Sequence, residues 1–259
     1  MNELNTTASV KKQYASSENL STRISIHDKY STNKLGFANW IFQNYRFEPG
    51  MKVLELGCGT GDMWRNRDDM IRDRELLVLS DFSDGMVETS RQNVGEYDNV
   101  VYRTIDIMDI PYEDGCFDAV IANMMLYHVP DICRALSEVR RVLKGGGYFY
   151  CATFGEHGII EYLSEVLSAY GVADNTNKNF TLQNGYGILH RVFDEVEMRE
   201  YEDSLEVTDL DDMVEYIYSL SSMTTLGNMP KDEIKEVLAG ETENGVLKVP
   251  KEYGMFICR

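Results

Sequence analysis

The stretch VLELGCGTGDMW, residues Val53 to Trp64, places glycines at positions 57, 59 and 61 directly after a run of apolar residues. A chain that gives up side chains at alternate positions lets a ligand come close to its backbone. Such turns lie between a strand and a helix at the carboxyl edge of a parallel sheet. The stretch therefore predicts a strand, a ligand-binding loop and a helix, in that order.

From Met51 onward, short apolar runs alternate with helical patterns. The predicted strands cover residues 51–56, 76–80, 100–105, 117–122 and 148–153. The predicted helices between them cover residues 62–71, 84–93 and 131–143, and the glycines of LKGGGYFY are expected to stop the last helix before the fifth strand. This alternation predicts an α/β fold, a doubly wound and mostly parallel sheet covered on both faces.

The two ends of the chain do not follow this alternation of strands and helices. Residues 1–20 are polar and residues 20–45 have helical spacing, so residues 1–45 are expected to form an arm with lid helices. The main domain is expected over residues 46–259. Within it, a helix at 159–170, an extended run, two helices near 205–240 and a final strand in EYGMFICR follow in turn. They predict an antiparallel end to the sheet and a helical insertion that contributes to a substrate cover.

The composition excludes several classes of function. The net charge of −18 argues against a nucleic acid partner, because phosphate backbones require a basic face. The five cysteines form no C-x-x-C pair, so we expect reduced thiols and neither a disulfide framework nor a metal site. No signal-peptide core or membrane-spanning run is present. A cytoplasmic protein without a membrane partner is the expectation.

The acids around the glycine loop indicate what it binds. Asp81 stands 20 residues after Gly61, at the end of the next predicted strand, where a carboxylate can accept hydrogen bonds from ribose hydroxyls. Enzymes that bind dinucleotides also have a glycine-rich loop followed by an acid that binds the ribose. However, Asp62 replaces the third glycine of their motif, and an acid at a helix start would repel a pyrophosphate. With Glu55 before the loop, the sequence favours an adenosine-bearing ligand that carries positive charge and no phosphate.

Four segments together resemble the successive motifs of class I S-adenosylmethionine-dependent methyltransferases. They are VLELGCGTG, LSDFSDGM, TIDIMDIPYEDGCFDAVIANMMLYHVPD and EVRRVLKGGGYFYCATFG, between about Met51 and Gly155. The chain is most similar to the small-molecule group that includes ubiquinone and menaquinone biosynthesis methyltransferases. The resemblance implies a Rossmann-like sheet of seven strands whose last strand is antiparallel, with S-adenosyl-L-methionine as the cofactor.

The resemblance also implies the residues that hold the cofactor. Those for its methionine portion are Glu55, Gly57, Cys58, Gly59 and Gly61. Asp81 takes the ribose, and the adenine lies among Phe82, Met86, Asp106 and Ile107. Asn123 is placed beside the sulfonium. Acidic walls complement a ligand that carries a sulfonium and an ammonium against one carboxylate.

Methyl transfer from a sulfonium is an in-line displacement, so the protein mainly aligns the nucleophile and excludes water. A general base adds less, and only where the nucleophile must lose a proton. His128 follows the fourth predicted strand and His157 the fifth, so either is a candidate base. Tyr127 either faces the sulfonium, whose charge an aromatic ring favours, or fills the seam between helix and sheet.

Arg23, His27 and Tyr30 recur at helical spacing in TRISIHDKYS. In the resembled family an N-terminal helix folds over the cofactor. The hypothesis is that Tyr30 closes the pocket, with Arg23 on the methionine carboxylate. The alternative is a polar surface stripe.

Three functions remain open from the sequence. The first is methylation of a small molecule, with the methylated atom and the oligomeric state undetermined. An NAD-dependent oxidoreductase and a catalytically silent cofactor-binding module are the others. Tyr, Met and Leu residues near 205–240 suggest an acceptor that is partly apolar, although an amphipathic helix packed on its own sheet would look the same.

Overall fold

The computed structural model describes residues 17–220 and 229–259. The chain forms two compact units, each assembled from three segments. The sheet unit comprises residues 41–153, 179–199 and 254–259, and the helical unit comprises the described parts of 1–40, 154–178 and 200–253.

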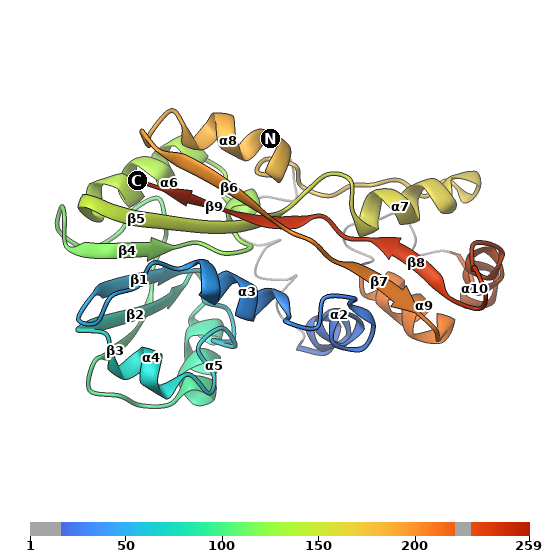
Figure 1. Cartoon of the computed structure of the whole chain (residues 1–259), viewed down its shortest axis with the longest axis horizontal. Helices are drawn as coiled ribbons and strands as arrows, with labels where there is room; N and C mark the ends of the chain where they lie inside the picture. The colour runs from blue at the N-terminus through green and yellow to red at the C-terminus, as the bar shows by residue number, and fades with distance from the viewer. Residues whose placement is uncertain (1–16, 221–228) are drawn as a thin grey trace. The chain divides into compact units, whose positions relative to one another are not determined.

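A seven-stranded sheet with the order β3-β2-β1-β4-β5-β9-β6 organises the sheet unit (Figure 1). Its strands are β1 (Lys52–Leu56), β2 (Leu76–Asp81), β3 (Val100–Thr104), β4 (Phe117–Ile121), β5 (Leu143–Phe154), β6 (Val196–Tyr201) and β9 (Tyr253–Cys258). The first five strands pair in parallel. The last strand, β9, lies between β5 and β6 and runs against them (Figure 1). The expected sheet with an antiparallel last strand is confirmed.

Apolar runs become central strands here because the sheet is covered on both faces. In β1, Val53, Leu54 and Leu56 are at most 1% exposed, as expected of a continuous apolar run in a buried parallel sheet. The helical elements of this unit are α4 (Asp68–Arg72), α5 (Asp84–Val94), η2 (Leu126–His128), α6 (Ile132–Val142) and α8 (Leu182–Leu189). The side chain of Asp131 caps α6 by accepting the Arg134 N–H at 3.0 Å.

Two local predictions are wrong. The helix expected over 62–71 is replaced by turns up to residue 67, with Asn66 in the left-handed region at φ 59°, and only α4 is helical. The second concerns the glycines of LKGGGYFY, which lie inside β5 and not before it. The register of β4 with β5 shifts from Phe117↔Leu143 to Ala119↔Tyr148, so the glycines form an irregularity within the strand.

Helix α8 was not predicted because its sequence, LQNGYGIL, contains two glycines. A reciprocal capping box between Thr181 and Asn184 starts the helix. A Cβ on Gly185 would lie 2.6 Å from the Phe256 ring, so the glycine allows the helix to pack closely on β9. Tertiary packing here overrides helix propensity.

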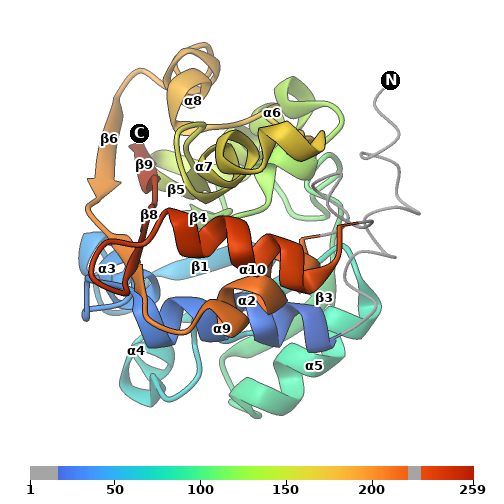
Figure 2. The same cartoon turned by 90° about the vertical axis from the view of Figure 1, so that its right-hand side faces the viewer.

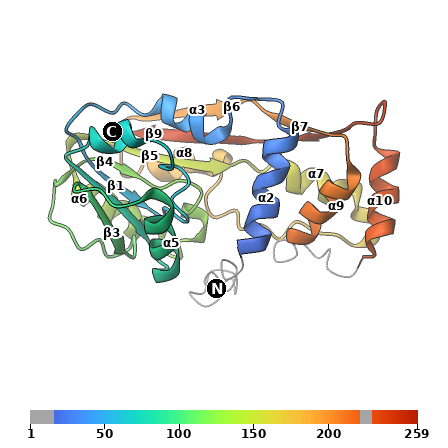
Figure 3. The ribbon, with the colours of Figure 1, turned by 90° about the horizontal axis from the view of Figure 1, so that it is seen from below.

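The helical unit surrounds a core of its own. Its elements are α2 (Ser17–Tyr30), α7 (Ile159–Val166), η3 (Ser168–Tyr170), α9 (Leu210–Ser219), α10 (Lys231–Gly240) and the hairpin of β7 (Ser204–Val207) with β8 (Leu247–Pro250). Figures 2 and 3 show α2, α9 and α10 side by side. Their apolar faces bury Ile26, Ile217 and Ile234 in one cluster. The helix α3 (Phe37–Asn44) begins in this unit and ends in the sheet unit.

Candidate functional site

The glycine loop is fastened to the end of β2. The backbone N–H of Gly59 donates to Asp81 Oδ2 at 3.0 Å, and the N–H of Cys58 donates to the Ser80 carbonyl at 2.8 Å. Asp81 Oδ1 accepts the N–H of Ser83 at 2.9 Å. A carboxylate has about four lone-pair positions, so Asp81 retains acceptor capacity for a ligand's hydroxyls. Asp81 therefore holds the loop in place, and its carboxylate oxygens can still accept hydrogen bonds from a ligand.

The three glycines of the loop differ in what surrounds them. All have positive φ, at 75°, 54° and 77° for Gly57, Gly59 and Gly61. A Cβ on Gly57 would lie 2.9 Å from the Met125 side chain, and one on Gly61 would lie 2.5 Å from Ser90 Oγ. A Cβ on Gly59 would meet nothing within 4 Å. Only Gly59 borders open space, which is the local shape that a ligand lying against the backbone requires.

No helix begins at Asp62. Its Oδ2 accepts the Thr60 hydroxyl at 2.7 Å within a turn, and the next helix starts at Asp68 with two acids in its first turn. The prediction that Asp62 stands at a helix start is therefore wrong. No helix N-terminus therefore lies at this loop in the described structure, so the premise on which the sequence argued against a dinucleotide is not met.

Glu55 is buried beneath the loop, with 2% of its surface exposed. The indole Nε1–H of Trp64 donates to Glu55 Oε2 at 2.6 Å. Burial raises the pKa of Glu55 to about 7, the Trp64 hydrogen bond lowers it, and the charge of Asp81 raises it further. Trp64 was not predicted as a site residue from the sequence. Its presence as a polar-tipped aromatic in the same motif as a buried acid was the available signal.

Asn123, at the end of β4, is tied into the sheet by both ends of its amide. Its Nδ2 donates to the Tyr45 hydroxyl at 2.7 Å, and its Oδ1 accepts the Ala152 N–H at 3.0 Å. Tyr45 is buried, which raises its pKa well above the usual value. Tyr45 was not predicted from the sequence either, because this contact joins residues 78 positions apart.

The residues predicted for the adenine come together because β2 and β3 end at the same edge, with Asp81 opposite Thr104. Phe82 exposes 39% of its surface, whereas Ile107 is buried. Asp106 Oδ1 accepts the N–H of Met108 at 2.8 Å, which fixes its carboxylate. Met86 is half-buried at the start of α5.

The candidate catalytic side chains lie in different units. Tyr127 and His128 are in η2 of the sheet unit, in the segment that follows β4, with ring centroids 4.5 Å apart. Burial lowers the pKa of His128 to about 4, so its ring is neutral at neutral pH. His157 belongs to the helical unit and is exposed, and its Nδ1 lies 3.0 Å from Glu161 Oε2, which raises its pKa.

The polar stripe on α2 faces α9 within the helical unit. The Tyr30 hydroxyl donates to Asp212 Oδ2 at 2.5 Å, and Arg23 Nη2 donates to the Ser219 carbonyl. His27 packs edge-on against Tyr216. The three residues are thus engaged inside their own unit, and the closure of the cofactor pocket by Tyr30 and Arg23 stays a prediction.

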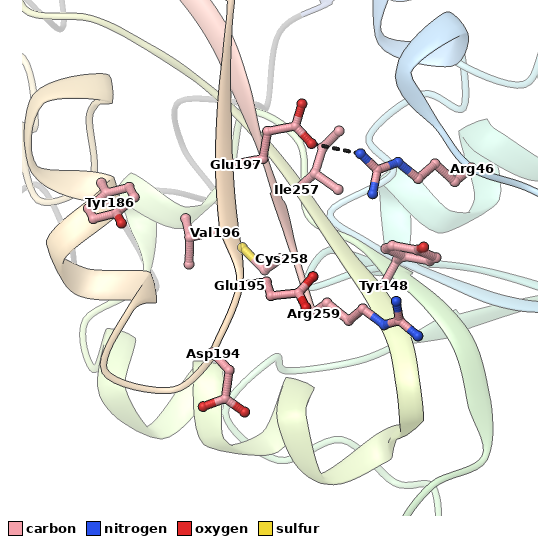
Figure 4. Close-up of a pocket in the computed structure, with 10 residues that line it drawn as sticks. All are labelled: Arg46, Tyr148, Tyr186, Asp194, Glu195, Val196, Glu197, Ile257, Cys258 and Arg259. Carbon is pink, nitrogen blue, oxygen red and sulfur yellow. Dashed lines mark hydrogen bonds and ion pairs between the residues drawn. The ribbon is translucent and has the colours of Figure 1, made fainter.

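A separate polar hollow of about 310 Å³ lies at the opposite edge of the sheet (Figure 4). Arg46, which precedes β1, pairs with Glu197 at 2.7 Å, and its guanidinium lies 5.5 Å from the Tyr148 ring centroid. Arg259 approaches the same ring at 5.6 Å. The glycine loop follows β1, so this hollow belongs to a different edge from the predicted cofactor site.

Comparison with known proteins identifies the region around the loop. Residues 54–151 match the family described as a methyltransferase domain. Over 102 residues the chain is 37% identical to a demethylmenaquinone methyltransferase of Staphylococcus aureus strain MRSA252, covering 39% of this chain and 42% of that protein. Over 124 residues it is 36% identical to the ubiquinone/menaquinone biosynthesis C-methyltransferase UbiE of Enterobacter sp. strain 638, covering 47% and 49%. The match thus spans less than half the length of these curated relatives.

Among solved structures, a putative methyltransferase from Bacillus halodurans C-125 has a similar fold. Its TM-score is 0.56 at 15% identity, covering 85% of this chain and 96% of that one. Within residues 17–220 and 229–259, no helix has the length and apolar character needed to cross a bilayer. Residues 54–151 therefore match a methyltransferase domain, and over part of its length the chain is similar to methyltransferases named for demethylmenaquinone and for ubiquinone and menaquinone biosynthesis.

Proposed function

We propose that this protein transfers the methyl group of S-adenosyl-L-methionine to a small-molecule acceptor. The observation that carries the proposal is the loop at 57–61, which lies inside the matched domain, borders open space at Gly59 and is fastened to Asp81. Class I cofactor binding needs such a backbone cradle next to a carboxylate. The bound cofactor supplies an activated methyl group, so the chain's own task is to bind, orient and exclude water.

The cofactor residues keep the roles that the resemblance implies. Asp81 is proposed to accept the ribose hydroxyls with its remaining lone pairs, and the exposed ring of Phe82 offers a face to the adenine. Asn123 is held by Tyr45 just after β4, the strand next to β1, which supports its place near the sulfonium. The remaining proposed contacts are Glu55, Gly57, Cys58, Gly61, Met86, Asp106 and Ile107, with Arg23 and Tyr30 as the cover.

His128 is proposed as the group that accepts a proton from the acceptor, when the acceptor must lose one. It lies in the same unit as the glycine loop, and its burial keeps the imidazole neutral and able to accept. A base with so low a pKa suits an acidic proton. His157 and Tyr127 remain weaker proposals, because His157 is exposed and paired with Glu161, and Tyr127 is packed at 8% exposure.

The acceptor is proposed to be a small and partly apolar molecule. The curated relatives carry names that refer to demethylmenaquinone and to ubiquinone and menaquinone biosynthesis, which supports such a molecule. The net charge of −18 argues against nucleic acid. All five cysteines are free thiols, which supports a cytoplasmic location.

Calorimetric titration of the purified chain with S-adenosylmethionine, S-adenosylhomocysteine and NAD tests the proposal. We expect heat with the first two and none with NAD. Binding must be followed by a turnover assay, in which candidate acceptors gain the mass of one methyl group. Binding without any turnover would favour the silent module, and binding of NAD alone would favour the oxidoreductase.

A further inference from the structure

The strand β6 is the last in the sheet order, so one of its edges has no neighbouring strand in the part of the chain that the structure describes. Glu195, directly before β6, exchanges both backbone hydrogen bonds with Arg259, at 3.2 and 2.9 Å. A Cβ on Gly254 of β9 would collide with the Arg199 carbonyl oxygen, so this carbonyl also points toward β9. Backbone groups alternate between the two edges of an antiparallel strand. The N–H and C=O groups of Met198 therefore face the open edge.

One face of β6 carries two opposite charges beside this edge. Arg199 Nε donates to Glu197 Oε1 at 2.7 Å, so the two side chains lie on the same face. Arg46 pairs with the other carboxylate oxygen of Glu197, also at 2.7 Å. Glu197 is exposed and Arg199 is half-buried. A strand that adds to this edge therefore meets one negative and one positive charge, two positions apart.

The other face of the same edge is apolar. Met198 exposes 41% of its surface there, and Val196 shares this face because side chains alternate along a strand. Figure 4 shows Val196 on the side of β6 that faces Tyr186 of α8, which exposes 49% of its surface. A single exposed apolar side chain is ordinary on a protein surface. Here, two of them accompany an unpaired strand edge, which together form a surface suited to another strand.

We propose that two copies of this chain pair through this edge, with β6 of one copy antiparallel to β6 of the other and Met198 opposite its own counterpart. Met198 then exchanges both backbone hydrogen bonds with its counterpart, and the two methionine side chains meet on the apolar face. On the other face, Glu197 of each copy lies opposite Arg199 of the other copy. The sheet of one copy thereby continues into the sheet of the second.

The order of the charges selects this register and favours a second copy as the partner. Antiparallel self-pairing centred on Met198 places opposite charges across from each other. Centring on Glu197 or on Arg199 would place like charges opposite each other, which destabilises a pair of strands. Centring on Val196 would place Glu197 opposite Glu195. The strand is thus complementary to itself in the register centred on Met198, and such an isologous contact closes at a dimer.

Sedimentation velocity of the full chain from about 5 to 500 µM tests the pairing. The shared stretch is short and its ion pairs are exposed, so we expect a weak dimer with a Kd of about 10–100 µM. Arg199→Glu places like charges across the edge and should raise this Kd about tenfold. Adding Glu197→Arg to that variant restores opposite charges and should restore dimerisation.

The control for these variants is Arg91→Glu, which makes the same change of charge at a comparably exposed arginine. Arg91 lies on α5, which packs on β2 and β3 at the other end of the sheet order. Its dimerisation should equal that of the wild type.

A cysteine at position 198 tests the register. The two Cα atoms of an opposed, hydrogen-bonded pair are about 5.5 Å apart, which suits a disulfide. Cys116→Ser and Cys133→Ser first remove the thiols that are not buried. In that background, Met198→Cys should give a covalent dimer on oxidation with diamide. Val196→Cys, on the same face, should not, because its counterpart would lie about 14 Å away.

The inference is overturned if the wild type stays monomeric throughout this range, in which case the charges beside the edge serve to block pairing. A dimer whose Kd is unchanged in Arg199→Glu would overturn it as well, because another surface would then be responsible. Equal cross-linking by the cysteines at 196 and 198 would refute the register. None of these measurements needs a cofactor, so their outcome is separate from that of the proposed function.

Discussion

Two carboxylates beneath and beside the loop perform different tasks, although both are acids within one motif region. Asp81 accepts backbone N–H groups from Gly59 and Ser83, so its charge is compensated by donors. Glu55 has the Trp64 indole as its strong donor and is more deeply buried. Because of these different environments, the Asp81 carboxylate holds the loop, whereas the Glu55 carboxylate changes its ionisation near neutral pH.

Asp81→Asn is expected to weaken S-adenosylmethionine binding about tenfold to hundredfold, since hydrogen bonds to a charged acceptor contribute about 1.5–3 kcal/mol. Calorimetric titration measures the change in Kd. Asp62→Asn is the control, because Asp62 is an exposed acid of the same loop whose side chain contacts Thr60 and Arg65. Equal losses in the two variants would contradict the role of Asp81.

Glu55→Gln is expected to stabilise the ligand-free protein at high pH. The pKa of Glu55 is raised from 4.5 to about 7, so between these values the folded state holds a proton that the unfolded chain has lost. The free energy of unfolding therefore falls as the pH rises through this window. The variant should exceed the wild type by about 2–3 kcal/mol at pH 8 and equal it near pH 5.

Urea unfolding of both proteins at the two pH values measures this difference. A wild-type protein whose free energy of unfolding changes between pH 5 and pH 8 just as that of Glu55→Gln does would show that Glu55 does not titrate in this range.

At the level of elements, the glycines of the loop at 57–61 have two different surroundings. Gly57 and Gly61 allow the loop to approach Met125 and helix α5, whereas Gly59 faces open space. The same residue type thus serves packing at two positions and leaves room for a ligand at the third. The short α4 follows only after six residues of turn, so the loop owes its shape to tertiary contacts.

Gly61→Ala is expected mainly to lower the stability of the protein, and Gly59→Ala mainly to weaken cofactor binding. Alanine at 61 would place its Cβ 2.5 Å from Ser90 Oγ and 2.8 Å from the Val94 side chain, which should lower the free energy of unfolding by about 2–4 kcal/mol. Alanine at 59 has room and loses only about 1–2 kcal/mol from its left-handed backbone, but it should weaken cofactor binding about tenfold or more.

Urea unfolding and titration calorimetry on both variants separate these effects. A Gly59→Ala protein that binds the cofactor with wild-type affinity would show that the open space at this position is not the ligand's.

At the scale of the whole molecule, each of the two units is built from segments that lie far apart in the sequence. The chain passes from one unit to the other after residues 40, 153, 178, 199 and 253, so neither unit is a continuous piece of sequence. The helical unit is fastened internally by an ion pair between Lys251 and Asp203, whose side chains are 5% and 0% exposed. Lys251 also donates to Ser31 at 2.8 Å, which joins the end of α2 to the β7–β8 hairpin.

Lys251→Met is expected to destabilise the helical unit by about 3–5 kcal/mol, because it leaves the buried Asp203 carboxylate without its cation. The protein has two tryptophans, Trp40 in the helical unit and Trp64 in the sheet unit. The fluorescence of Trp40 in a Trp64→Phe background reports urea unfolding of the helical unit, and its midpoint should fall.

The control is Lys235→Met, in the same unit, which breaks an exposed ion pair with Asp211 and should cost less than about 1 kcal/mol. A similar midpoint for the two variants would contradict the importance of the buried pair.

The sequence alone determined the α/β architecture, the place of the glycine loop and the position of Asp81 at the end of the next strand. These follow from hydrophobic periodicity and from the rule that parallel strands present their carboxyl ends at one edge, so local spacing carries the information. Helix propensity predicted the helices less well: residues 62–67 form turns where a helix was expected, and the capped helix α8 was not expected.

Only the tertiary structure decided which glycine borders open space, that Trp64 holds Glu55, and that Tyr45 holds Asn123. The physical reason is that burial and hydrogen bonding depend on which side chains meet across the fold. Tyr45 contacts Asn123 from 78 residues away, and Ser90 of helix α5 makes a glycine necessary at position 61, and no local sequence pattern records such contacts.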